Sequence, residues 1–245
     1  MAEPLLHVDN LGKRFGGFVA LDGINLSVQP GERVGLIGPN GSGKSTLVNC
    51  MCGTLHNETG TVRFDGQIVD GLAANQRTHR GMARSFQLPR PFHTLSVAEN
   101  LRIPLLFTAH SRSGRHLSHD EIESRCHELA GLVGLAAKAR KLPRDLTQVE
   151  MRKLELARAM AADPKLLIAD EAMAGLSQSE VTDIVDLLIK LNERGVTIIL
   201  IEHIMRAVMS FSQRLVVLVS GKKIADGAPD QVVNTREVIG AYLGE

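Results

Sequence analysis

Hydrophobic residues along the chain follow two spacings, one typical of strands and one typical of helices. Near the N-terminus, Ile24, Leu26 and Val28 alternate with polar residues, and glycine and proline punctuate the segment. We therefore predict strands and turns over residues 5–28, as an antiparallel edge region of a sheet. Short apolar runs, typical of buried parallel strands, occur at residues 34–37, 166–169 and 196–201.

Helical spacing is clearest after three hydroxyl residues. Ser118, Thr147 and Ser177 each precede a glutamate three positions later, which is the capping-box pattern and predicts the start of a helix. The helix after Thr147 would bury Leu154, Ala157 and Ala161, and the helix after Ser177 would stop at Gly195. Residues 95–162 therefore read as mainly helical, apart from a polar gap at residues 110–116.

The remaining segments complete the predicted architecture. Residues 60–66 read as a short strand, residues 214–219 and 223–225 as a hairpin, and a short helical tail ends near Leu243. The basic, irregular stretch from Ala73 to Arg90 is interpreted as a linker. Together these elements predict an α/β fold with a mixed sheet core, an antiparallel edge region and an inserted α-helical subdomain. The predicted boundaries are a single domain at 1–245, its core at about 1–87 and 163–245, and the helical subdomain at about 88–162.

Composition narrows the possible functions. The 245 residues include 28 Lys and Arg against 27 Asp and Glu, so the formal charge of +1 gives no reason to expect nucleic acid as a partner. The hydrophobic fraction is 44%, with 3% aromatics and no Trp, which favours parallel sheets covered by helices. No apolar run approaches the ~20 residues of a membrane helix. We expect a soluble, cytosolic chain whose three cysteines are free thiols.

One segment matches the phosphate-binding pattern G-x-x-x-x-G-K-[ST] in full. It consists of Gly38, Pro39, Asn40, Gly41, Ser42, Gly43, Lys44, Ser45 and Thr46. Its glycines let backbone N–H groups wrap a β-phosphate, and the helix that follows directs its positive end at the same anion. Lys44 would reach the β- and γ-phosphates, and Ser45 would place its hydroxyl on Mg²⁺. The alternative is a plain glycine turn.

Further candidates follow the apolar runs. Asp170 and Glu171 end one strand, and His203 follows another, so we expect them to converge with the phosphate loop at the carboxyl edge of the sheet. Asp170 would hold Mg²⁺ through a water bound to the ion, and Glu171 would orient or deprotonate a water that attacks the γ-phosphate. Alternatively, the carboxylates only cap a turn and His203 is simply packed or exposed. Phe15 and Phe18 lie beside glycines; Phe15 could stack on adenine or pack ordinarily.

The order of these motifs resembles that of the nucleotide-binding subunits of ATP-binding-cassette (ABC) transporters over essentially the whole chain. The resemblance implies a P-loop NTPase fold of the ABC type, with ATP and Mg²⁺ as cofactors. It implies that Phe15 stacks on adenine, that Gln87 contacts the nucleotide and Mg²⁺, that Glu171 is the catalytic glutamate and that His203 is the switch histidine. It also implies a head-to-tail dimer, in which ATP lies between one subunit's phosphate loop and the other's signature helix.

Several short segments resemble more narrowly the ATPases of branched-chain amino-acid importers. They are Lys13-Arg14-Phe15-Gly16-Gly17, Ala83-Arg84-Ser85-Phe86-Gln87, Ala174-Gly175-Leu176, Ile201-Glu202-His203 and the ending Val238-Ile239-Gly240-Ala241-Tyr242-Leu243-Gly244. Relatives of that group also move urea, short amides and aromatic acids, so substrate choice would belong to partner chains. The implied partners are transmembrane permease subunits, which would bind around residues 87–101, a second ABC ATPase in a homo- or heterodimer, and indirectly a solute-binding protein. The chain would be cytoplasmic and peripheral on the inner face of the cell membrane.

The signature segment departs from the family pattern Leu-Ser-Gly-Gly-Gln. Its residues here are Leu146, Thr147, Gln148, Val149 and Glu150. Val149 replaces a glycine that lets backbone approach the partner's γ-phosphate, and Glu150 adds negative charge near an anion. Ala172 and Ser177 also replace the usual proline and Asp or Asn. We hypothesise an asymmetric pair, in which this signature serves a weaker site and a different ATPase supplies the better one. Alternatively, the backbone is set slightly back and both sites are active.

Other functions stay open at this point. The altered signature suggests a nucleotide-sensing cassette with little turnover, but Glu171 and His203 argue against it. A soluble, non-transport ABC ATPase acting on nucleic acid or ribosomes usually carries two cassettes or long inserts, and this chain has neither a second cassette nor a basic excess. A P-loop kinase fits poorly with the Asp-Glu strand end and the downstream histidine.

Overall fold

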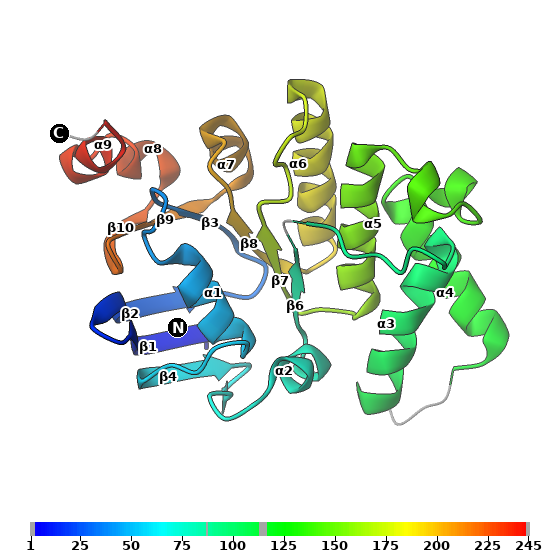
Figure 1. Ribbon diagram of the computed structural model, residues 1–245, viewed down its shortest axis with the longest axis horizontal. Helices are drawn as coiled ribbons and strands as arrows, with labels where there is room; N and C mark the ends of the chain where they lie inside the picture. The colour runs from blue at the N-terminus through cyan, green and yellow to red at the C-terminus, as the bar shows by residue number, and fades with distance from the viewer. Residues whose placement is uncertain (1–2, 87, 113–116, 244–245) are drawn as a thin grey trace.

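The computed structural model describes residues 3–86, 88–112 and 117–243 and shows two β-sheets flanked by helices (Figure 1). The strands are β1 Leu6–Phe15, β2 Phe18–Val28, β3 Arg33–Ile37, β4 Thr59–Phe64, β5 Gln67–Ile68, β6 Met82–Ser85, β7 Leu166–Asp170, β8 Thr197–Ile201, β9 Arg214–Val219 and β10 Lys222–Gly227. The helices are α1 Lys44–Cys52, α2 Ala74–Arg80, α3 Val97–Arg112, α4 His119–Leu132, α5 Gln148–Ala161, α6 Gln178–Glu193, α7 Met205–Phe211, α8 Pro229–Val232 and α9 Arg236–Leu243.

The central sheet has six strands in the order β10-β9-β3-β8-β7-β6. Its neighbours run parallel except β10, which pairs antiparallel with β9, so the predicted mixed sheet is confirmed. The apolar runs are buried on both faces because alternate residues enter different cores. Leu166 and Ile168 of β7 pack into one core, whereas Leu167 and Ala169 pack into the other.

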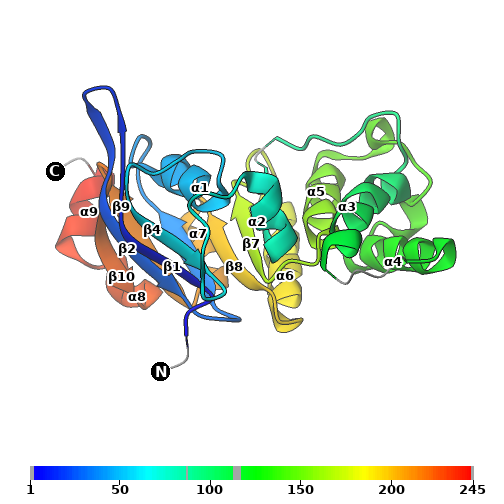
Figure 2. The same ribbon diagram turned by 90° about the horizontal axis from the view of Figure 1, so that it is seen from below.

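The N-terminal strands form their own antiparallel sheet in the order β2-β1-β4-β5. The predicted antiparallel region is therefore present, as a separate sheet and not as an edge of the central one. This sheet and α1 share a hydrophobic core with one face of the central sheet, while α5 and α6 pack on the other face. Figure 2 shows the two sheets at one side of the molecule and helices α3, α4 and α5 at the other.

The three predicted capping boxes are confirmed. Ser118, Thr147 and Ser177 are the N-caps of α4, α5 and α6. In α4, for example, the Glu121 amide donates to Ser118 Oγ over 3.2 Å, and the Ser118 amide donates to Glu121 Oε2 over 2.8 Å. These reciprocal bonds satisfy amides that the first turn of a helix otherwise leaves unpaired. Helix α3 continues to Arg112, so it extends into the polar gap predicted from residue 110.

The predicted linker at residues 73–90 is wrong over most of its length. It contains helix α2, which ends at Gly81 in a left-handed conformation with φ 110°, and strand β6, which forms the edge of the central sheet. Arg77, only 1% exposed, donates to the carbonyls of Cys50 and Met51 over 2.8 and 2.7 Å. A basic residue usually indicates a segment exposed to solvent. Arg77 can instead be buried, because its guanidinium binds carbonyls at the C-terminal end of α1.

Cys50, Cys52 and Cys126 are free and buried. Burial raises the pKa of Cys52 to about 11, so its thiol stays protonated near neutral pH. Among the described residues, no helix combines the length and the apolar character required to cross a membrane.

Candidate functional site

The phosphate loop connects β3 to α1 and passes near the start of the small sheet. Gly43 has φ 102°, and a Cβ at this position would lie 2.7 Å from the Ala20 carbonyl oxygen. At Gly38, a Cβ would lie 2.1 Å from the Leu218 carbonyl oxygen. The loop therefore needs glycine at both positions, and the absence of side chains leaves its backbone amides open to an anion.

Lys44 begins α1 and folds back over the loop. Its ammonium donates to the carbonyls of Gly38 and Pro39 over 2.7 and 3.0 Å, and lies 3.4 Å from Ser42 Oγ. Burial lowers the pKa of Lys44, and the negative charges of Glu171 and Asp170 partly offset that effect. The ammonium thus lies among neutral acceptors at the loop, where phosphate oxygens would be stronger acceptors.

A cavity of about 240 Å³ lies over this loop. Residues 40–46 line it together with Phe18, Ala20 and Glu171. Phe15 pairs with Phe18 across the β1–β2 turn and lies 5.4 Å from Lys13 Nζ, but it does not line the cavity. Phe18, 62% exposed, is therefore the aromatic residue that lines this cavity, and the sequence provided a signal for it only through its neighbouring glycines.

Asp170 and Glu171 lie at the carboxyl end of β7. The Asp170 carboxylate is mostly buried and accepts a bond from Arg84 Nη2 at 2.5 Å. Glu171 has φ 46°, an uncommon conformation for a non-glycine residue, and its amide donates to the Ile201 carbonyl over 2.9 Å. This left-handed turn sets the Glu171 side chain among the loop residues that line the cavity.

His203 follows β8 and is exposed. The residue before it, Glu202, is 1% exposed and accepts a bond from the Met173 amide over 2.8 Å. Burial raises the pKa of Glu202, an effect partly offset by the Met173 amide and by His203. The sequence placed Glu202 only in the segment Ile201-Glu202-His203 and gave no sign of its burial, which depends on packing against the segment after Glu171.

The signature residues are held by their own helix and lie outside the phosphate-loop cavity of this chain. Thr147 caps α5, and Val149 packs against the hydrophobic core beneath it. Glu150 Oε2 accepts bonds from the Thr147 amide at 2.8 Å and from Lys138 Nζ at 2.7 Å, and these contacts lower the pKa of Glu150. Leu146 precedes the cap, and Gln148 points toward Gly175, with Nε2 at 2.8 Å from the site of a Cβ there.

Gln87, predicted to contact the nucleotide and Mg²⁺, lies outside the described residues. Tyr242, in the C-terminal segment, has a pKa raised by burial and partly restored by a hydrogen bond with the backbone of Gly38. The last helix therefore reaches the phosphate loop, a contact that the sequence did not indicate.

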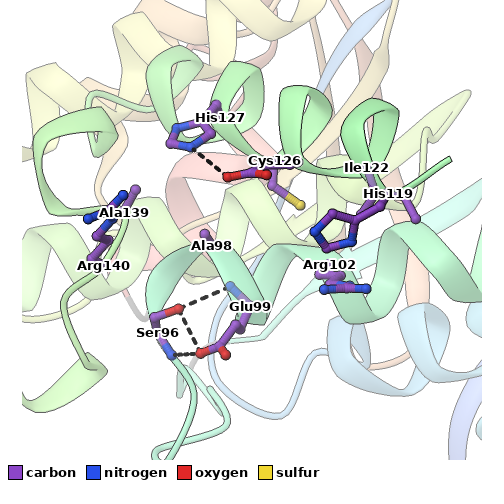
Figure 3. A pocket seen from close by; sticks show the side chains of 11 residues that line it. Ser96, Ala98, Glu99, Arg102, His119, Ile122, Cys126, His127, Ala139 and Arg140 are labelled. Carbon is purple, nitrogen blue, oxygen red and sulfur yellow. Dashed lines mark hydrogen bonds and ion pairs between the residues drawn. The ribbon is translucent and has the colours of Figure 1, made fainter.

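A second cavity, of about 230 Å³, lies in the group of helices at the far end of the molecule (Figure 3). It is lined by α3, α4 and the turn at residues 136–140, and the sticks in Figure 3 include Arg102, His119 and Arg140. No phosphate-loop residue lines it. It is a separate feature from the nucleotide site.

The central sheet, the glycine loop at the start of α1 and the carboxylates at the end of β7 define a P-loop nucleotide-binding protein. Residues 21–174 match the ABC transporter family model. The chain belongs to the ABC transporter family, which confirms the resemblance predicted from its motifs. The predicted fold class is confirmed as well, because ABC cassettes of known structure align with nearly the whole chain.

Among curated proteins, the chain is similar to BraF, a high-affinity branched-chain amino acid transport ATP-binding protein of Pseudomonas aeruginosa, with 37% identity over 100% of both chains. It is equally similar to LivG of Escherichia coli, also 37% identical over 100% of both. A solved cassette in its ADP conformation, MJ1267, aligns with a TM-score of 0.88 and 30% identity over 100% of both chains. The cassette MJ0796, dimeric in a post-hydrolysis state with ADP and Pi, aligns with a TM-score of 0.80 and 27% identity over 91% of this chain and 98% of that one.

Proposed function

We propose that this chain is the ATP-hydrolysing subunit of an ABC importer that takes up branched-chain amino acids or a related small solute. The full-length similarity to BraF and LivG supports the class of cargo. The observation that carries the catalytic part is the position of Glu171, which lines the same cavity as the phosphate loop. A nucleotide in that cavity would place its terminal phosphate beside a carboxylate able to act on water.

The donor set fits Mg²⁺-ATP, because the Ser45 hydroxyl and the Asp170 carboxylate are the hard oxygen ligands that Mg²⁺ prefers. These two residues would hold the ion, with Gln87 as a further predicted contact, and the bound ion would neutralise charge on the phosphate oxygens. Lys44 would bind the β- and γ-phosphates, and Phe15 would stack on the base. Glu171 would accept the proton of the attacking water, and His203 would serve as the switch histidine.

The complete site would need a second ATPase. The signature residues 146–150 lie outside this chain's own cavity, so they are available to an ATP held by another subunit. We infer a head-to-tail dimer with a second copy or a related ATPase, attached to permease subunits at the cytoplasmic face of the membrane. Phe86, Leu88 and Phe92 are 44%, 69% and 42% exposed, and these exposed apolar side chains in and just before residues 87–101 support a permease contact there.

Purification from gently solubilised membranes tests the proposal. A tagged chain should bring down two hydrophobic permease chains, identified by mass, and the complex in vesicles should take up leucine only with ATP present. Permeases with a second, related ATPase would establish a heterodimer, and permeases with this chain alone a homodimer. Recovery of the tagged chain without any membrane protein would refute the importer and favour the sensing or non-transport alternatives.

A further inference from the structure

Arg84 is bound to the proposed metal ligand Asp170. Its guanidinium donates from Nη2 to Asp170 Oδ2 over 2.5 Å and from Nη1 to Asn49 Oδ1 over 2.7 Å. The side chains of Arg84 and Asp170 are 16% and 12% exposed, so water screens this ion pair little. Arg84 therefore ties the loop helix α1 to the end of β7.

The sheet register explains this contact. Strand β6 runs parallel to β7, and Arg84 pairs with Ile168, two residues before Asp170. Residues two apart on a strand share a face, so Arg84, Ile168 and Asp170 all face the core that contains α1. An arginine at this position of the edge strand reaches Asp170 and Asn49 together.

The same carboxylate cannot serve both cations equally well. The guanidinium at Asp170 Oδ2 partly neutralises the charge that this carboxylate would offer to the ion or to its bound water, and its own positive charge would repel Mg²⁺. The hold on Arg84 is also incomplete, because its buried Nε has no hydrogen-bond partner among the described residues. Two side-chain hydrogen bonds, to Asp170 and Asn49, therefore hold the guanidinium in place.

We propose that Arg84 is the counter-ion of Asp170 in the nucleotide-free protein and that Mg²⁺-nucleotide displaces it, which rests on the proposed Mg²⁺ site. The guanidinium also lies over the Phe86 ring, with its carbon 5.3 Å from the ring centre, so its displacement would alter this cation–π contact. Phe86 is one of the exposed apolar residues at the start of the segment proposed to contact the permease. Arg84 is thus a positioning residue that links metal occupancy at Asp170 to the conformation of the permease-contact segment.

Binding of a fluorescent methylanthraniloyl-ATP to the full chain, measured at increasing Mg²⁺, tests this role without any turnover. Loss of a charged hydrogen-bonding competitor should lower the half-saturating Mg²⁺ concentration about tenfold in Arg84→Met. Arg84→Lys, which keeps the charge but not the fork, should fall between the two. The matched control is Arg80→Met, an exposed arginine at the end of α2 that binds Gln67.

The Mg²⁺ titrations distinguish the counter-ion role of Arg84 from the existence of the metal site. An unchanged or higher Mg²⁺ requirement in Arg84→Met, with a normal Arg80→Met, would overturn the proposal and would mean that Arg84 helps to orient Asp170. A wild-type protein whose nucleotide binding ignores Mg²⁺ would refute the proposed metal site itself. Because Arg84→Met leaves Asp170 without its cation, its nucleotide-free melting temperature should fall, which separates a counter-ion from an idle contact.

A second measurement follows the guanidinium directly. The chain has no Trp, so Phe86→Trp introduces a single tryptophan reporter beside Arg84, which can be excited selectively. Mg²⁺ with ATP should change its emission, whereas ATP with EDTA should not. The combined Arg84→Met and Phe86→Trp variant should lose the Mg²⁺-specific change. The same response in both proteins would contradict the displacement of Arg84.

Discussion

At the scale of single residues, Glu171 and Glu202 are glutamates with opposite surroundings. Glu171 is partly exposed at the phosphate-loop cavity, whereas Glu202 is almost fully buried one residue before His203. A carboxylate that acts on water needs access to that water. In a buried carboxyl group, desolvation disfavours the charged form and raises the pKa. The two should therefore respond differently to the same isosteric substitution.

Glu171→Gln should lower phosphate release at least about 100-fold, because the amide cannot take a proton from water. Binding of methylanthraniloyl-ATP should stay close to that of the wild type, since the charge of Lys44 and the loop amides are unchanged. Glu193→Gln, at the exposed end of α6, is the matched control. Unchanged phosphate release in Glu171→Gln would show that Glu171 is not the base, whereas background release from both the wild type and the variant would support the nucleotide-sensing alternative.

Glu202→Gln should change the pH dependence of stability. Because the folded pKa of Glu202 is raised, the folded protein binds this proton more tightly than the unfolded chain does. The proton bound to Glu202 stabilises the folded protein fully below the ordinary pKa of 4.5. This stabilisation is lost as pH rises through the pKa of Glu202 in the folded protein. The difference in melting temperature between Glu202→Gln and wild type should thus grow in favour of the variant above pH 4.5 and then level off. A difference independent of pH would contradict this account.

The residues that the sequence could predict are those whose chemistry depends on local spacing. The phosphate loop, Asp170 and Glu171 follow from strand ends and glycine positions, and the structure places Glu171 in the cavity over the loop. Arg84 could not be predicted in the same way, because its partner Asp170 is 86 positions away and only the pairing of β6 with β7 brings them together. Long-range register leaves no mark on a single stretch of sequence.

At the scale of elements, α2 shows why a segment predicted as a linker is structural. Its Arg77 donates to four backbone carbonyls, including those of Cys50 and Met51 at the end of α1. Helix α1 has no basic residue in its own last turn, so Arg77 supplies the cation that its negative end favours. Helix propensity alone does not reveal a partner of this kind.

Arg77→Met should therefore destabilise the protein by about 3 kcal/mol, because several buried carbonyls lose a charged donor. Urea unfolding monitored by circular dichroism would measure the loss. Arg80→Met, on the same helix but exposed, should stay within about 0.5 kcal/mol of the wild type. Equal effects in the two variants would show that the buried contacts of Arg77 contribute little.

The start of α5 bears on the hypothesis of an asymmetric pair. Val149 packs against the core, and Lys138 already compensates the charge of Glu150, so both side chains are held by this chain's own contacts. These contacts favour the alternative in which the altered signature is tolerated.

The combined Val149→Gly and Glu150→Gln variant should therefore leave the turnover of the assembled transporter unchanged. It should also lower the melting temperature, through the lost packing of Val149 and the weak helix propensity of glycine. The control is Glu150→Gln alone, which keeps Val149. A clear rise in turnover in the combined variant would instead support the asymmetric pair.

At the scale of the whole molecule, the proposed head-to-tail dimer predicts that one chain does not complete its own site, because residues 146–150 lie outside its phosphate-loop cavity. With the Glu171→Gln change and ATP, the chain should dimerise in light scattering and return to monomer when ATP is removed. Lys44→Ala in the same background should stay monomeric, since the loop loses its phosphate contact. If the Glu171→Gln chain is monomeric at every ATP concentration, a different ATPase must complete the site.

The general architecture was accessible from the sequence because apolar runs and capping boxes are strong, local signals. The division into two sheets was not, since alternation in residues 24–28 predicts a strand but not its partner. The placement of Tyr242 against the phosphate loop likewise depends on how the C-terminal helices pack on β9 and β10, which no periodicity encodes.

The central sheet separates two cores, and adjacent residues of β7 belong to different ones. Leu167 packs with the helices α5 and α6, whereas its neighbour Ile168 packs with α1 and the small sheet. Ile168 pairs across the sheet with Ile199 of β8, which lies in the same core. A compensating substitution for a change at Ile168 should therefore be sought at Ile199, 31 positions along the chain, and not at the adjacent Leu167.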